Sequence, residues 1–256
     1  MFQGTTKVVK VAVVVAGVAG LFLSSLVSDA EAVHKVYSPK VEKGEWGVEM
    51  RGHVDFDDDQ SKDDEQKYKS AIGYGVTEWW KTELVYELEK EADSSRYVSE
   101  AVEFENIFQV TDDDAFIDFG IYLAYVLKTN GTKDKAEGKL LFEKRLGDFK
   151  HTANINLEKL LGNDAGEELE GGFAWKTKYY WKEFFRPGFE YHAGFGEFKE
   201  DLDFDEQTHQ VGPVFYGEFE ISESSKIEYE IGHLFGISEA APDGSLKWLL
   251  EFEFEF

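Results

Sequence analysis

Hydrophobic and polar residues alternate with a period of two along most of this chain. The clearest stretch is the C-terminus, where apolar residues occupy every second position from Leu246 to Phe256 and most positions between them are charged. A period of two is typical of a β-strand with one apolar and one polar face, whereas an amphipathic helix repeats every three to four residues. The pattern therefore predicts strands rather than helices.

The same alternation predicts further strands upstream. The clear ones lie near residues 45–56, 80–89, 117–127, 173–181 and 227–235. Weaker ones lie near 66–77, 97–110, 135–145, 149–159, 187–197 and 208–221. Together with the C-terminal strand they predict an all-β fold of about twelve antiparallel strands.

The connections between these strands form two sets of different length. One set is longer, polar and acidic, and it covers 57–65, 90–96, 129–135, 161–170, 198–207 and 238–245. The other set is shorter and covers 77–79, 111–115, 146–149, 183–187 and 221–226. Alternating strands also build soluble barrels and sandwiches, but short turns at one end and long loops at the other are typical of a transmembrane β-barrel.

Aromatic residues gather near the shorter connections. They are Trp46, Trp79, Trp80, Phe116, Phe149, Tyr180, Trp181, Phe184, Phe185, Phe254 and Phe256. Aromatic girdles mark the level at which a barrel meets the lipid headgroups. A soluble fold would explain the alternation, but it would not explain why the rings cluster at one end.

The N-terminus has the parts of a secretory signal peptide. Lys7 and Lys10 precede an apolar run over 11–27, and Ala30-Glu31-Ala32 supplies the small-x-small pattern of a cleavage site. A membrane anchor is the alternative, but the run of about 17 residues is at the short edge of the spanning range. We therefore predict cleavage after residue 32. The chain has no cysteine, which excludes lipoprotein attachment and disulfides.

The formal net charge of −25 argues against nucleic acid as a partner, because phosphate binding needs a positive surface. No segment after the N-terminal run reaches the roughly 18 apolar residues of a spanning helix. Insertion into a membrane would therefore have to use strands.

The last strand resembles the C-terminal strand of bacterial outer-membrane β-barrels, which ends in an aromatic residue preceded by apolar residues at every second position. Phe252, Phe254 and Phe256 occupy the matching positions. The resemblance implies an outer-membrane location, contact with membrane lipid and lipopolysaccharide, and recognition of these three residues by the barrel-assembly machinery.

The expected organisation is a signal peptide over 1–32, a short periplasmic segment over 33–44 and an outer-membrane barrel over 45–256. Twelve-stranded barrels of this superfamily include narrow channels, a phospholipase and autotransporter translocators. The resemblance therefore concerns the membrane and the fold, and it leaves the solute open.

Charged residues dominate the face that we expect to point inward. The predicted pore-lining residues are Glu49, Arg51, Asp55, Glu83, Glu87, Glu105, Arg145, Lys176, Lys178, Glu190, Glu228 and Glu230. We expect a channel with an acidic lumen that passes small polar or cationic solutes, with Arg51, Arg145, Lys176 and Lys178 as an opposing basic strip. The alternative is a non-conducting structural or surface-interaction barrel whose interior is plugged by paired charges and whose acidic loops bind partners.

Two patterns suggest metal binding, and neither is specific. Asp55 to Asp59 is similar to a calcium loop, but Gln60 stands where glycine is needed and Gln66 where a bidentate glutamate belongs. His53 and His192 are expected to face inward near acids, but no tight metal-ligand spacing accompanies them. We interpret the first as a solvated acidic loop and the second as part of a polar lumen, so no metal site is expected.

A lipid-modifying enzyme is a third and weaker interpretation. Its mechanism would need a serine beside a histidine on the lipid-facing side. The lipid-facing candidates His151, His233, Ser70 and Asn106 lie on strands that are not neighbours. We therefore expect no catalytic site and no cofactor.

Overall fold

Each strand of this protein pairs antiparallel with the strand before it and the strand after it. A computed structural model describes residues 34–256 except 93, 163–168 and 199–200, so the predicted signal peptide lies outside the described residues. The strands are β1 (Trp46–Phe56), β2 (Gln66–Thr77), β3 (Trp80–Lys90), β4 (Val98–Gln109), β5 (Asp118–Lys128), β6 (Lys135–Leu146), β7 (Phe149–Leu160), β8 (Glu170–Tyr179), β9 (Arg186–Glu197), β10 (Thr208–Ser222), β11 (Ser225–Gly236) and β12 (Gly244–Phe254).

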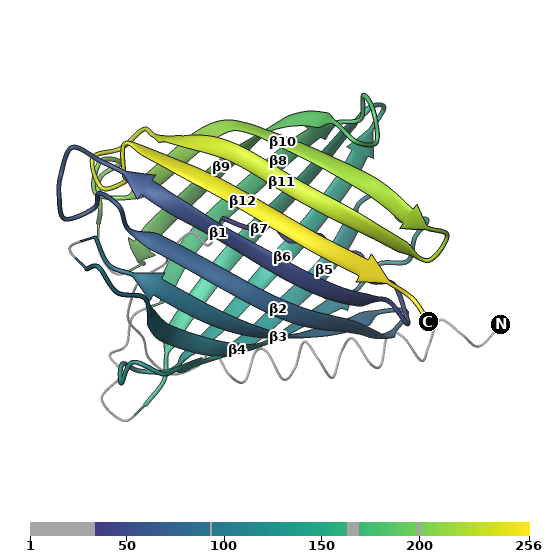
Figure 1. Cartoon of the computed structure of the whole chain (residues 1–256), viewed down its shortest axis with the longest axis horizontal. Helices are drawn as coiled ribbons and strands as arrows, with labels where there is room; N and C mark the ends of the chain where they lie inside the picture. Colours follow the sequence, from purple (N-terminus) through teal and green to yellow (C-terminus); the bar gives the residue numbers. More distant parts are fainter. Residues whose placement is uncertain (1–33, 93, 163–168, 199–200) are drawn as a thin grey trace.

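The sheet closes on itself through β1 and β12 (Figure 1). These two strands pair along their whole length, from Trp46 opposite Phe254 to Phe56 opposite Gly244. A closed sheet leaves no strand edge with unsatisfied backbone groups, which is the condition for spanning a bilayer with strands. The predicted fold class is confirmed, and the weaker sequence patterns correspond to strands as regular as the clear ones.

The two ends of the barrel differ as the sequence predicts. Turns of two residues, 78–79, 147–148 and 223–224, lie at the same end as the C-terminus. The connection 57–65 and the connection 237–243 lie at the opposite end, at the left of Figure 1. In the orientation of outer-membrane barrels the tight turns face the periplasm.

The outer and inner faces have opposite chemistry. Large apolar side chains on the outer face are about half exposed, among them Val48, Met50, Leu84, Tyr86, Phe104, Tyr125 and Leu250. Most of the side chains that alternate with them along the strands are charged or polar and are buried inside the barrel. Apolar side chains outside and polar side chains inside are the reverse of the arrangement in a soluble protein, and they fit a barrel surrounded by lipid. Within the described residues, no helix is long and apolar enough to cross a membrane.

The barrel interior also contains a small apolar cluster. It consists of Ile107, Tyr122, Ala124 and Leu141 from the wall, together with Tyr37 and Val41 from the chain that precedes β1. Part of the N-terminal segment therefore lies inside the barrel.

Candidate functional site

The predicted pore-lining residues point into the barrel because they occupy alternate positions of their strands. Those buried inside are Glu49, Arg51, Asp55, Glu83, Glu87, Glu105, Lys176, Glu190 and Glu230. Lys178 and Glu228 are half-buried nearer the tight turns. Arg145 lies exposed at the end of β6, where it donates a hydrogen bond to the carbonyl of Gly147 (3.1 Å) and stacks on Tyr180.

Most of these charges are paired with one another. The ammonium of Lys69 lies between Glu87 (3.2 Å) and Glu103 (2.6 Å). The ammonium of Lys247 lies between Glu190 (2.7 Å) and Glu230 (3.3 Å). Because a buried charge is costly unless it is paired and hydrogen-bonded, such networks are expected wherever water is excluded. The middle of the lumen is therefore a network of opposite charges.

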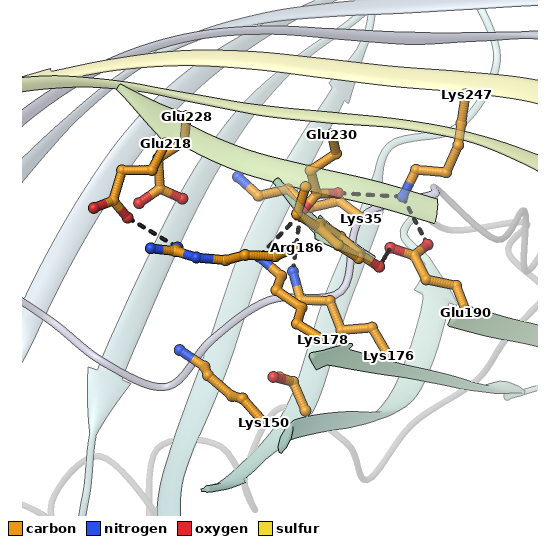
Figure 2. Close-up of polar contacts among 12 residues, drawn as sticks. Lys35, Lys150, Lys176, Lys178, Arg186, Glu190, Glu218, Glu228, Glu230 and Lys247 are labelled. Atoms are coloured by element: carbon orange, nitrogen blue, oxygen red, sulfur yellow. Dashed lines mark hydrogen bonds and ion pairs between the residues drawn. The ribbon is translucent and has the colours of Figure 1, made fainter. Parts of the chain in front are cut away.

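Basic side chains form one wall near the tight turns, as Figure 2 shows. Lys150 on β7 is directly opposite Lys178 on β8. Arg186 on β9 extends this wall and shares the ring of Tyr180 with Arg145. Sequence reasoning missed Lys150 and Arg186, although both lie at inward positions of weaker strands.

Acids of β10 and β11 face this basic wall. Glu218 accepts a hydrogen bond from Arg186 (3.0 Å), and Glu230 lies 3.1 Å from Lys176. Arg51, in contrast, lies on β1, where it pairs with Glu49 of the same strand and with Glu105 of β4 (3.6 Å). The prediction that placed Arg51 in the same strip as Lys176 is therefore wrong, because β1 and β8 are not neighbours in the barrel.

The chain before β1 runs inside the barrel. Val36, Tyr37 and Val41 are buried among inward side chains of several strands. The segment predicted as periplasmic, 33–44, therefore lies within the lumen over residues 34–41. We call these residues the lumen segment. The short length and mixed composition of this stretch gave no sign of it, since the alternation of β1 begins only at residue 45.

Tyr37 is the central anchor of the lumen segment. Its backbone N–H donates to Oδ1 of Asn154 on β7 (2.7 Å), and its carbonyl accepts from Nδ2 of the same side chain (2.9 Å). Its hydroxyl donates to Glu105 (3.1 Å) and accepts from Arg51 (3.1 Å). Its ring lies 4.8 Å from that of Tyr122. Burial, with Glu105 nearby, raises the pKa of Tyr37 well above its usual value.

Polar contacts hold both ends of the lumen segment. Lys35 forms an ion pair with Glu49 (2.5 Å), and the backbone N–H of Val41 donates to the side-chain carbonyl of Gln109 (3.0 Å). Burial alone would lower the pKa of Lys35, but Glu49 and Glu83 raise it above its usual value, so the ammonium stays charged. The positive charge of Lys35 is thus neutralised by acidic side chains of the barrel wall.

Two glycines of the wall leave room for the chain as it enters. A side chain at Gly75 would place Cβ 1.8 Å from the carbonyl oxygen of Glu42. A side chain at Gly120 would place Cβ 2.8 Å from Cβ of Pro39. The backbone of Gly75 also hydrogen-bonds to that of Gly44 (2.8 Å) and Glu45 (2.9 Å). The wall is therefore shaped to the segment that it encloses.

His34 joins the two histidines that the sequence singled out. Its ring centroid lies 4.5 Å from that of His53 and 5.3 Å from that of His192, and its Nε2 lies 2.7 Å from Oε1 of Gln210. Burial lowers the pKa of His34 well below 6.5, and the nearby His53 and His192 lower it further. In the described part of the chain, no group of three or more histidines, cysteines or acids is arranged to hold a metal ion.

The acidic residues at the end of β1 and in the loop after it accept hydrogen bonds from nearby backbone and side-chain groups. The carboxylate of Asp57 accepts hydrogen bonds from the backbone N–H groups of Asp59 (2.7 Å) and Asp243 (3.3 Å). The side chain of Asp55 turns inward and accepts a hydrogen bond from Ser245. These carboxylates therefore point to different partners.

The histidines considered for catalysis lie in outward aromatic layers. His151 on β7 stacks on Trp175, and His233 on β11 packs against Phe235. Asn106 accepts a hydrogen bond from Trp80 (3.0 Å), and Ser70 lies on β2. The four candidates thus stay on separate strands, and the structure does not bring them together.

Comparison with known proteins extends the assignment of the fold. No family model and no curated protein matches the sequence. Among solved structures, the chain is similar to the COG4313 outer membrane channel from Pseudomonas putida F1, with 12% identity, a TM-score of 0.58 and coverage of 90% of this chain and 100% of that one. It is also similar to the NanC porin, with 12% identity, a TM-score of 0.52 and coverage of 82% and 100%.

These likenesses show the fold: the chain forms a closed antiparallel β-barrel similar to those of bacterial outer-membrane proteins. The resemblance of its last strand to that superfamily is thus confirmed at the level of the fold. Its closed sheet and apolar exterior agree with a location in the outer membrane.

Proposed function

We propose that this barrel is an outer-membrane channel for small polar or cationic solutes. The observation that carries the proposal is a charged vestibule at the end with the tight turns, where the lumen side chains keep contact with water. The side chains of Lys150, Glu218 and Glu228 are 25%, 22% and 32% exposed, in contrast to the paired charges deeper in the barrel. A polar, hydrated lumen inside an apolar exterior is the arrangement that passes solutes.

The charge of the protein supports a preference for cations. The chain carries 52 acidic and 27 basic residues, and its longer loops are acidic. Acids near a channel mouth raise the local concentration of cations. The two similar structures, named as an outer membrane channel and a porin, agree with this class of function.

The reversal potential of the refolded mature protein in a planar bilayer tests the proposal. Under a salt gradient, a potential of the sign set by cations is the expected result. Absence of any current from protein shown to be folded and inserted would overturn the channel function, and an anion-selective current would overturn the cation preference.

A second candidate is a non-conducting barrel whose acidic loops interact with partners or divalent ions. The observation that favours it is the filled middle of the lumen, where Glu105, Glu190 and Lys247 are at most 1% exposed. Deletion of the 57–65 loop separates the two functions. A surface phenotype lost without any change in permeability would favour this candidate.

A further inference from the structure

The barrel wall contacts the backbone of the lumen segment as well as its side chains. Asn154 is 1% exposed, and its amide pairs with both the N–H and the carbonyl of Tyr37. Gln109 accepts the N–H of Val41, four residues further on. Any extended peptide presents these groups, so paired amide contacts of this kind recognise peptide backbone.

Two further contacts select side chains along the same path. Glu49 receives the ammonium of Lys35. The ion pair of Arg51 and Glu105 receives the hydroxyl of Tyr37, with Arg51 as donor and Glu105 as acceptor. Lys35 and Tyr37 are two residues apart, which in an extended chain gives them a fixed separation. The wall therefore distinguishes a lysine placed two residues before a tyrosine.

We propose that Glu49, Arg51, Glu105, Gln109 and Asn154 form a peptide-binding site in the lumen, which the lumen segment occupies and which accepts a short basic peptide from solution when that segment leaves. The ligand class is an extended peptide with a lysine two residues before a tyrosine. If the barrel conducts, departure of the segment also opens its middle, and this last step rests on the channel function proposed above.

Competition for the site has a quantitative consequence. The lumen segment is tethered to β1 only a few residues away, so its effective concentration at the site is on the order of millimolar or above. A peptide from solution must reach a similar concentration to displace it. The lumen segment must also be out of the site in some fraction of the molecules. A substitution that weakens its contacts with the wall increases this fraction.

The absence of native cysteines allows occupancy to be measured in the full mature protein. In a Val36→Cys variant the new thiol replaces a side chain that is 1% exposed, so a water-soluble maleimide reacts with it only when the segment leaves. Ser38→Cys, at a half-buried position of the same segment, provides a second reporter if the first fails to fold. This measurement does not depend on conduction, so a barrel that carries no current still gives a result.

Adding Asn154→Ala should raise the labelling rate by about tenfold, because two hydrogen bonds to the segment are lost. Asn156→Ala is the matched control. Asn156 is the next inward asparagine on β7, and the amide contacts with Tyr37 are made by Asn154. An equal effect of the two substitutions would overturn the role of Asn154 as an anchor.

The decisive step is a competition with free peptide. A peptide of sequence His-Lys-Val-Tyr-Ser-Pro-Lys-Val, identical to residues 34–41, at several times the millimolar scale of the tether should raise the labelling rate of the Cys reporter. The same peptide with Tyr37→Ala or Lys35→Glu should raise it far less. Failure of the native peptide to change the rate, or equal effects of all three peptides, would overturn the peptide-binding site while leaving the channel function untouched.

Discussion

The ammonium of Lys247 on β12 lies 2.7 Å from a carboxylate oxygen of Glu190 on β9, and both side chains are almost completely buried. The same carboxylate group accepts a hydrogen bond from the hydroxyl of Tyr216 (2.6 Å) and lies 2.8 Å from Nε2 of His192. Three strands thus meet at one acid, because β9, β10 and β12 each send an inward side chain toward this site. The pair is a cross-link through the interior of the barrel.

Removing one member of this pair should destabilise the barrel strongly. Lys247→Met leaves Glu190 buried without its nearest cation, and breaking such a pair typically costs about 3–5 kcal/mol of unfolding free energy. Urea unfolding of the protein in lipid vesicles, followed by tryptophan fluorescence, measures the loss. Lys43→Met is the control, since Lys43 pairs with Glu78 in solvent and should leave stability unchanged. Equal losses in the two variants would contradict a structural role for the buried pair.

Ion selectivity should depend on two acids of the vestibule. Glu218 and Glu228 are directly opposite on β10 and β11, and their side chains are partly exposed to water. Neutralising both with glutamine removes two negative charges from the mouth, so the reversal potential should move toward zero. Glu91→Gln, in the loop between β3 and β4 at the other end, is the control. An unchanged reversal potential in the double variant would exclude these acids from selectivity.

A methyl group at one wall glycine should expel the lumen segment. In Gly75→Ala the new Cβ overlaps the backbone carbonyl of Glu42, so the chain entering the barrel has to move. Reactivity of the Val36→Cys thiol should rise. Gly73→Ala is the matched control, because its Cβ meets only the side chains of Glu83 and Lys81. If both alanines act alike, close packing at Gly75 does not hold the segment.

Acid should weaken the seating of the lumen segment. The pKa of His34 is lowered while it is buried beside His53 and His192, with Lys247 also lowering it and Gln210 raising it. Below about pH 6.5, the ordinary pKa of a free histidine, the released segment takes up a proton that the seated segment does not. The seated state is therefore fully favoured above that pH and is weakened progressively as the pH falls.

The labelling rate of Val36→Cys, corrected for thiol reactivity with a free cysteine reference, checks this dependence between pH 7.5 and pH 5. His34→Asn should remove most of it. A pH dependence that survives this substitution would assign the effect to another group of the lumen.

The last residue should matter for assembly more than for stability. Phe256 extends beyond β12, is fully exposed and contacts only the ring of Phe254 among the aromatic contacts of the described residues. Its deletion should change the urea midpoint of the refolded barrel very little, while the amount in the outer membrane of cells falls severalfold. A large loss of stability in vitro would instead give Phe256 a structural role.

Strand positions could be predicted from the sequence because alternation has a direct physical cause. A strand between lipid and lumen must alternate apolar and polar side chains, and β12 does so almost without exception. The end of β8 was harder to place, since aromatic residues at 179–181 continue past the last strand residue, Tyr179. Headgroup-level rings follow the membrane interface and not the strand end.

The contents of the lumen could not be predicted in the same way. Inward orientation follows from periodicity, and it correctly indicated residues such as Glu190 and Glu105. Contacts between inward side chains depend on the arrangement of the strands, which alternation does not give. Arg51 therefore contacts Glu105 and lies far from Lys176 along the wall, whereas Lys150 lies directly opposite Lys178. The lumen segment has no periodicity of its own, because its contacts come from strands on several sides, among them β1, β4, β5, β7 and β10.

Closure of the barrel by β1 and β12 sets the order in which the molecule can be assembled. β12 is the last strand in the sequence, and it closes the barrel by pairing along the whole of β1. The lumen segment precedes β1 in the sequence. That segment must already lie on the inner side of β1 when the seam forms, or else enter later through an open mouth. The barrel thus folds around the lumen segment, and pairing of β1 with β12 is the step that separates the lumen from the surrounding lipid.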